Sequence, residues 1–178
     1  MHSYNSKHLW LLRKSFMDKK TFWSYKKIAQ FKIPLLGICF GHQAIAKALV
    51  GNVVKSSKGW RIGIKEITTK NYNSLLGNFK KLNLISFHKD QAVKLPQYFE
   101  LIADNSFCNI SFFSIGDKVL AIQAHPEFDR DFSLKLLQAR KSSIQPKTYL
   151  ETVNKLETLE NDGEMMAPDI FKLLEQKF

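Results

Sequence analysis

Hydrophobic residues form an unbroken run at residues 34–39, PLLGIC, without the alternating polar positions of a half-buried strand. Such a run predicts a strand that is covered on both faces, as in a parallel sheet. Residues 43–50 then carry the apolar spacing of a short helix. The connecting sequence GICFGHQ therefore predicts a tight turn from strand to helix, with Cys39 at the turn.

The same kind of pattern predicts the remaining elements. Strand patterns occur at residues 60–67, 82–87, 98–103, 108–115 and 118–124. The last two are joined by Gly116 and Asp117, a hairpin turn signal. Helical periodicity occurs at residues 7–31, 131–142, 148–160 and 167–177. This mixture predicts one α/β domain over residues 1–178, a three-layer sandwich with a mostly parallel central sheet and a helical C-terminal tail.

The composition narrows the class of protein. The chain has 178 residues, 44% of them hydrophobic, with neither a signal-peptide pattern at its start nor a run of ~18 apolar residues that could span a membrane. Its two cysteines, Cys39 and Cys108, are too few for a disulfide framework and lack zinc-site spacing. Cys108 lies in a hydrophobic strand pattern and is expected in the core. We expect a cytoplasmic protein with free thiols, no metal or other cofactor and no membrane association.

The net charge of +11 raises the question of a nucleic-acid partner. All but four of the 27 cations are lysines, they are spread over the whole chain, and no recognition motif accompanies them. We therefore expect no nucleic-acid partner. A basic binding module is an alternative that the charge alone supports.

The turn around Cys39 has the composition of a nucleophile elbow. Gly37 and Gly41 flank Cys39 at two residues on either side, as glycines flank serine in the G-x-S-x-G motif. The N-terminus of the following helix favours the thiolate, and the Phe40 N–H is predicted to donate to an oxyanion on the attacked carbonyl. His42 is expected to be structural. The alternative for Cys39 is a buried structural thiol in a glycine-containing turn.

A second motif, IQAHPEF at residues 122–128, supplies a base. His125 follows an apolar strand, and Pro126 biases it toward an extended conformation. Residues two apart in an extended chain project to the same side, so the Glu127 carboxylate can approach His125 and fix its tautomer. We predict a base and its orienting carboxylate at this strand end. The alternative is a structural histidine.

The combination of GICFGHQ and AHPE resembles the class I glutamine amidotransferases. The segments SFHKDQAV and KGWRIGI and the helical tail extend the resemblance to the branch of GMP synthetases and γ-glutamyl peptidases. It implies a Cys-His-Glu triad that hydrolyses a γ-glutamyl amide through a thioester. Cys39 would be the nucleophile, His125 the general base and acid, and Glu127 its orienting group.

The resemblance also implies where the substrate binds. Gln43 and the backbone around His88, Lys89 and Asp90 would hold its γ-glutamyl portion. Two structural alternatives stay open. Gln43 can simply cap or pack the first turn of its helix, and His88 and Asp90 can form a hydrogen bond within their loop.

Members of this family begin with strands before the nucleophile strand and with a glycine-rich loop that completes the oxyanion hole. Here no glycine precedes His2, and His2 and Trp10 resemble residues that follow that loop. We expect an N-terminally incomplete domain, with Phe40 as the remaining identifiable oxyanion donor and an apolar sheet edge prone to association. Loss of one such donor costs ~10²- to 10³-fold in rate.

The implied activity is that of a glutaminase or γ-glutamyl hydrolase acting on a small molecule. No P-loop or synthetase module follows the domain in this sequence, so an ammonia acceptor would be a separate protein. The alternative is a truncated, catalytically impaired remnant or a subunit that works only with a partner.

Overall fold

The computed structural model describes Ser24, Lys27 and residues 33–49, 51–70, 72–95 and 98–176. Apart from Ser24 and Lys27, which are helical, the predicted helix at residues 7–31 lies outside the described residues, as do His2 and Trp10. The elements are β1 (Leu35–Ile38), α3 (Phe40–Ala48), β2 (Asn52–Lys55), β3 (Arg61–Thr69), β4 (Lys81–His88), β5 (Asp90–Lys94), β6 (Glu100–Asp104), β7 (Phe112–Ile115), β8 (Val119–Ile122), α4 (Arg130–Ala139), η1 (Lys141–Ser143), α5 (Pro146–Thr158), η2 (Gly163–Met166) and α6 (Ala167–Leu174).

The described strands form a mixed sheet. Six strands follow the order β1-β8-β7-β6-β3-β4, and β2 pairs with β5 in a separate two-stranded ribbon. β1 and β8 are parallel, whereas the other neighbours in the larger sheet are antiparallel. The α/β class is confirmed, but the prediction of a mostly parallel sheet is wrong for the described strands. The reason lies in the connections, because a parallel pair needs a long crossover and β7 reaches β8 through a short turn at Gly116.

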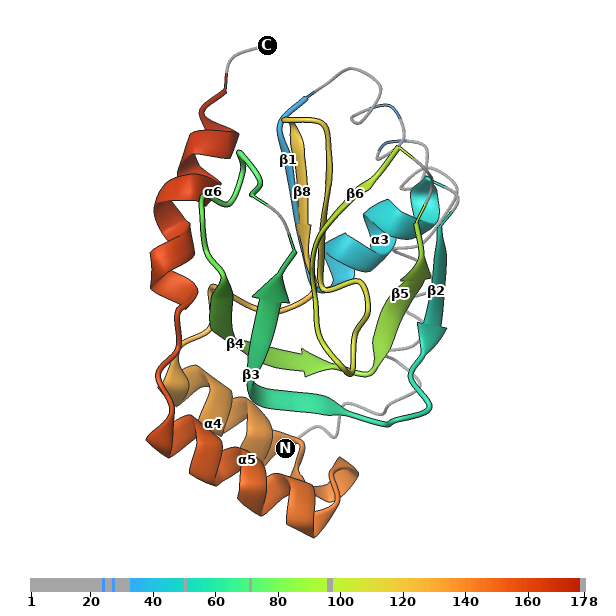
Figure 1. Cartoon of the computed structure of the whole chain (residues 1–178). Coiled ribbons are helices and arrows are strands. Elements are labelled where there is room, and N and C mark those ends of the chain that lie inside the picture. Colours follow the sequence, from blue (N-terminus) through green and yellow to red (C-terminus); the bar gives the residue numbers. More distant parts are fainter. Residues whose placement is uncertain are drawn as a thin grey trace.

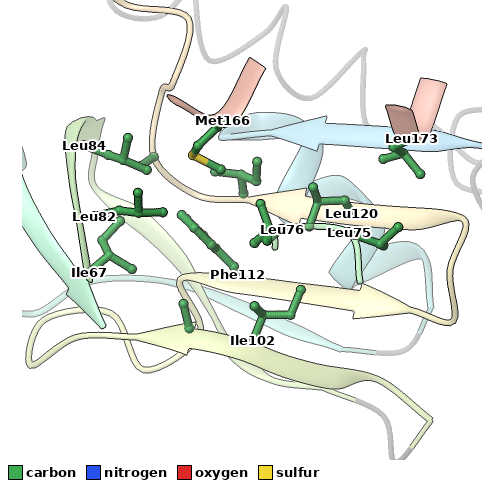
Figure 2. Close-up of a cluster of buried hydrophobic side chains, with 13 residues drawn as sticks. Ile67, Leu75, Leu76, Leu82, Leu84, Ile102, Phe112, Leu120, Met166 and Leu173 are labelled. Atoms are coloured by element: carbon green, nitrogen blue, oxygen red, sulfur yellow. The ribbon is translucent and has the colours of Figure 1, made fainter. Parts of the chain in front are cut away.

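Helices cover both faces of the sheet, as a three-layer arrangement requires. Side chains alternate along a strand, so Phe112 packs in a cluster with η2 and α6 on one face, while Phe113 packs with α3 on the other. Figure 2 shows the first cluster, where Met166 and Leu173 lie beside side chains from the strands. Among the described residues, no helix is both long and apolar enough for a membrane span.

The β3–β4 end of the sheet has its own cover. Ile62 and Ile85 pack with Leu137 of α4 and Leu156 of α5 in a third cluster. Figure 1 shows α4 and α5 side by side at this end, below β3 and β4. These helices match the predicted segments 131–142 and 148–160 within a few residues.

Candidate active site

The parallel pairing of β1 and β8 brings the two sequence motifs together. Ile38 pairs with Ile122 at the ends of these strands. One residue further, the Cys39 N–H donates to the Ile122 carbonyl oxygen at 2.8 Å. The turn that carries Cys39 and the segment that carries His125 therefore leave the sheet at the same edge, because parallel strands end on the same side.

The backbone at Cys39 is strained, as a nucleophile elbow predicts. Cys39 has φ 48° and ψ −95°, and within the described part of the chain it is the sole non-glycine residue with positive φ. A Cβ atom at Gly37 would lie 2.4 Å from Ile45 Cδ1 and 2.8 Å from the Gly41 carbonyl carbon, so β1 and α3 pass too closely for a side chain there. A Cβ at Gly41 would meet no described atom within 4 Å. A side chain is therefore sterically excluded at Gly37 but not at Gly41.

Helix α3 directs its N-terminus toward the site. Cys39 occupies the N-cap position, its side chain makes no capping hydrogen bond, and the first turn carries no acidic residue. Phe40 is the first helical residue, and the first N–H groups of a helix have no acceptor within the helix. The sulfur and the Phe40 N–H thus belong to the positive end of an uncapped helix.

His125 lies between Cys39 and Glu127. Its Nδ1 atom is 2.7 Å from Glu127 Oε1, and Cys39 is the other side chain close enough to raise its pKa. Burial alone lowers the pKa of His125, but the hydrogen bonds and charges of Cys39 and Glu127 outweigh it and raise the pKa to about 9. This arrangement favours an imidazolium beside the sulfur at neutral pH.

Backbone and aromatic contacts fix the His125 ring. The His125 N–H donates to the Ile85 carbonyl oxygen of β4 at 2.8 Å. The ring stacks on Phe128, with centroids 3.9 Å apart and planes 13° from parallel. The Phe128 carbonyl oxygen in turn accepts a hydrogen bond from Asn161 Nδ2 at 2.9 Å. The position of the imidazole is therefore fixed by the backbone hydrogen bond of His125 and by the stacking of Phe128 on one face of the ring.

Residues 161–163, which lead from α5 into the start of η2, contact both β4 and the segment that carries His125. Asp162 exchanges two hydrogen bonds with Asn83 of β4: its N–H donates to the Asn83 carbonyl oxygen at 2.8 Å, and its Oδ2 accepts from the Asn83 N–H at 2.6 Å. Gly163 lies so close to Pro126 that a Cβ would be 2.3 Å from the Pro126 carbonyl oxygen. In the sequence, Gly163 lies between two predicted helices, and nothing there indicates this contact.

Three of the predicted substrate residues, Gln43, His88 and Asp90, lie close together and form hydrogen bonds with one another. Gln43 Nε2 donates to the Asp90 carbonyl oxygen at 2.7 Å, and His88 Nδ1 lies 3.1 Å from the same oxygen. Burial is the main cause that lowers the pKa of His88 to about 4. The Lys89 Nζ atom lies 5.8 Å from the centre of the Trp60 ring. The hydrogen bond within the loop is thus present, and contact of these residues with a substrate stays a prediction.

Gln123 is a site residue that the sequence reasoning missed. Its Nε2 atom lies 3.6 Å from Cys39 Sγ. A signal for it exists in the sequence, because Gln123 is a polar residue at the end of the apolar strand VLAI and lies two positions before His125.

His42 and Cys108 both lie in the core, which was the prediction for Cys108. His42 is fully buried with its ring centroid 4.8 Å from that of Phe113, and burial is the main cause that lowers its pKa to about 3. Cys108 is 1% exposed, and burial raises the pKa of its thiol. No group of three His, Cys, Asp or Glu side chains that could hold a metal ion occurs in the described ranges.

The fold and this geometry define an α/β protein with a cysteine at a nucleophile elbow beside a histidine and a glutamate. Residues 15–134 match the family described as glutamine amidotransferase class-I, and the chain belongs to that family.

Comparison with individual proteins agrees with the family. The chain is 34% identical over 119 residues to γ-glutamyl peptidase 3 of Arabidopsis thaliana, covering 63% of this chain and 48% of that protein. It is 36% identical over 105 residues to a glutamine-hydrolyzing GMP synthase subunit of Methanobrevibacter smithii, covering 58% of this chain and 55% of that protein. It thus spans about half the length of these curated relatives. The fold matches a glutamine amidotransferase from Thermotoga maritima with a TM-score of 0.75 at 22% identity, covering 99% of this chain and 75% of that one.

Proposed function

We propose that this protein hydrolyses the γ-glutamyl amide bond of glutamine or of another γ-glutamyl compound through a thioester on Cys39. The observation that carries the proposal is the placement of His125 between Glu127, 2.7 Å from its Nδ1 atom, and Cys39 at the N-terminus of α3, both of which raise its pKa. A nucleophile, a base and an orienting carboxylate in this order are what covalent acyl transfer requires. The γ-glutamyl peptidases among the relatives support the substrate class.

The first half of the reaction forms the thioester. The Cys39 thiolate attacks the γ-carbonyl carbon, and the Phe40 N–H donates to the oxyanion that forms there. The His125 imidazolium then gives its proton to the departing nitrogen, the C–N bond breaks, and ammonia or an amine leaves. A pKa of about 9 keeps His125 protonated until this step.

The second half releases glutamate. His125, now neutral, removes a proton from a water molecule, and the resulting hydroxide attacks the thioester carbonyl carbon. The C–S bond breaks, and Cys39 again carries a thiolate beside the imidazolium. One water is consumed for each amide bond, and Glu127 keeps the imidazole oriented through its contact with Nδ1.

In the same proposal, Gln43 and the loop of His88, Lys89 and Asp90 border the γ-glutamyl portion of the substrate. The support is their convergence beside the elbow, since Gln43 lies on the first turn of α3 and binds the Asp90 carbonyl oxygen. Both cysteines are free thiols, which supports action in a reducing, cytoplasmic setting.

The test is to incubate the purified chain with glutamine and with γ-glutamyl dipeptides and to measure glutamate release. Cys39→Ala should abolish release, because it removes the attacking sulfur without adding volume. Cys108→Ala is the matched control and should retain activity, since Cys108 takes no part in the reaction. Release that survives Cys39→Ala would refute the proposed nucleophile.

A second candidate is a glutaminase that delivers ammonia to a separate partner protein. The observation that favours it is the similarity to GMP synthase subunits of Methanobrevibacter smithii and Methanothermobacter thermautotrophicus, 36% identical in each case. A peptidase would cleave γ-glutamyl dipeptides without a partner, whereas a partner-dependent glutaminase would prefer glutamine. If neither substrate turns over although iodoacetamide still modifies Cys39, the alternative of an impaired or partner-dependent protein is favoured.

A further inference from the structure

Three groups far apart in the sequence form a chain of hydrogen bonds that ends at the nucleophile. Gln43 Nε2 lies 2.7 Å from the Asp90 carbonyl oxygen and 3.2 Å from Gln123 Oε1. Gln123 Nε2 lies 3.6 Å from Cys39 Sγ. This series of hydrogen bonds therefore connects Asp90, at the start of β5, to the sulfur through two side-chain amides.

The direction of this chain is fixed by the backbone carbonyl at its far end. A carbonyl oxygen only accepts, so Gln43 must present its NH₂ group to Asp90. The same NH₂ group then donates to Gln123, which must present its oxygen to Gln43. The Gln123 NH₂ group is consequently the part of that amide that faces Cys39 Sγ. Reversing either amide would bring two donors or two acceptors face to face.

Burial makes that direction costly to reverse. Gln43 is 3% exposed and Gln123 is 1% exposed, so water does not compete for their amides. The Gln123 backbone is also held, because its N–H donates to the Ser111 carbonyl oxygen at 2.8 Å. An unmatched donor or acceptor at such a position destabilises the folded protein.

We propose that Gln123 is a catalytic residue that donates an amide hydrogen bond to the Cys39 sulfur and stabilises its thiolate. Gln43 is then a positioning residue that holds the Gln123 amide in the donating orientation. An N–H group forms a stronger hydrogen bond with a charged acceptor than with a neutral one. The contact with Gln123 therefore favours the thiolate over the thiol. The catalytic role of Gln123 rests on the proposed function. The stabilisation of the Cys39 thiolate by its amide does not depend on that function.

Titratable groups of the site lie on several elements. His125 and Glu127 follow β8, His88 ends β4, Asp90 begins β5 and His42 lies on α3. Burial keeps His42 and His88 neutral near pH 7, with pKa values of about 3 and about 4. The positive groups of the site that favour a thiolate are thus the His125 imidazolium and the end of α3, and Gln123 adds a neutral donor to them.

The test measures the rate at which iodoacetamide alkylates Cys39 in the full chain as a function of pH, with Cys39→Ala as the background. Gln123→Met removes the donor without adding charge. Gln123→Glu keeps an acceptor for Gln43 but places a carboxylate beside the sulfur. We expect Gln123→Met to lower the rate at pH 7 about tenfold and Gln123→Glu to lower it further. Gln145→Glu, the same change at an exposed position, should stay at the wild-type rate.

Gln43→Met tests the positioning role, because the Gln123 amide then loses its anchor. We expect a smaller decrease in the alkylation rate than for Gln123→Met, with a far-ultraviolet circular dichroism spectrum like that of the wild type. A folded Gln123→Met variant with the wild-type pH profile would overturn the donor role, and a wild-type rate in Gln43→Met would overturn the positioning role. If these rates change as expected but the wild type releases no glutamate, the proposed function fails and this inference stands.

Discussion

The Nδ1 atom of His125 lies 2.7 Å from the Oε1 atom of Glu127, although the two side chains differ in exposure, at 13% and 45%. The carboxylate therefore reaches a mostly buried imidazole from the solvent side. Together with Cys39, this contact holds the pKa of His125 at about 9, above its ordinary value of 6.5. In the proposed reaction, His125 acts as an acid first and as a base afterwards.

Glu127→Gln should lower turnover more than substrate binding and should move the pH profile. A raised pKa means that His125 keeps its proton below about pH 9 and loses it as the pH rises through that value. Activity that needs the imidazolium should therefore decline above about pH 9 in the wild type. Without the carboxylate charge, this decline should begin at lower pH. The measurement is kcat and KM for glutamate release between pH 6 and 10.

A titration of the His125 ring by NMR checks the same point without a substrate. Glu157→Gln, an exposed change on α5, serves as the control. If Glu127→Gln left both the kcat profile and the ring titration unchanged, Glu127 would have no orienting role.

Gly163→Ala should destabilise the fold and lower turnover, because the added Cβ would lie 2.3 Å from the Pro126 carbonyl oxygen. The added Cβ and the Pro126 carbonyl oxygen are both fixed to the backbone. Residues 161–163 or the segment carrying His125 must therefore move. We expect a loss of about 1–3 kcal/mol in the free energy of unfolding. Urea unfolding measures it, and Glu164→Ala, at the next and exposed position, is the control. Equal stability of the two variants would show that the close contact does not constrain the segment.

The two glycines of the elbow should respond differently to alanine. Gly37→Ala places a Cβ 2.8 Å from the Gly41 carbonyl carbon and should destabilise the fold by about 1–3 kcal/mol. Gly41→Ala meets no described atom within 4 Å and replaces a helical glycine, so it should stabilise the fold by up to about 1 kcal/mol. Thermal and urea unfolding of both variants compares them directly. Similar losses in the free energy of unfolding for Gly37→Ala and Gly41→Ala would contradict the steric difference between the two positions.

His42 should make the fold sensitive to acid. Its pKa is lowered to about 3, so the unfolded chain takes up a proton near pH 6.5 that the folded protein does not accept. Stability from this group is present above pH 6.5 and is lost as the pH falls toward 3. Between pH 7 and pH 5 the loss is about 2 kcal/mol.

His42→Leu removes this titration and should reduce the pH dependence of the unfolding free energy by that amount. His88 contributes in the same direction, whereas the raised pKa of His125 partly opposes them. Urea unfolding at several pH values measures the difference. A variant that loses as much stability as the wild type between pH 7 and pH 5 would refute the assignment.

The hairpin of β7 and β8 and the elbow could be predicted because each depends on neighbouring residues. Gly116 supplies the left-handed backbone of the turn, with φ 56°, and Gly37 allows β1 and α3 to pass closely. The mixed character of the sheet could not be predicted in the same way. An unbroken apolar run indicates that a strand is covered on both faces. It does not indicate whether the neighbouring strands run parallel or antiparallel to it.

The candidate site was predictable in the same uneven manner. Cys39, His125 and Glu127 lie in two short motifs, and the residue types and spacing within each motif indicate a nucleophile, a base and an orienting carboxylate. Gln123 was missed because a polar residue at a strand end has no defined role until its neighbour is known, and here that neighbour is a sulfur 84 positions away in the chain.

The extended conformation predicted for the His-Pro-Glu segment is wrong, because Pro126 and Glu127 lie in a turn in which the Phe128 N–H donates to the His125 carbonyl oxygen at 3.3 Å. The sequence by itself determined the strained turn at Cys39 and the order of most strands and helices. These follow from glycine spacing and side-chain periodicity, which act over a few residues. Only the tertiary structure decided that β1 runs parallel to β8, that residues 161–163 contact the segment that carries His125, and that Gln43 orients Gln123. Such contacts depend on strand direction, register and helix packing, which are set by the burial of the whole core and not by any one segment.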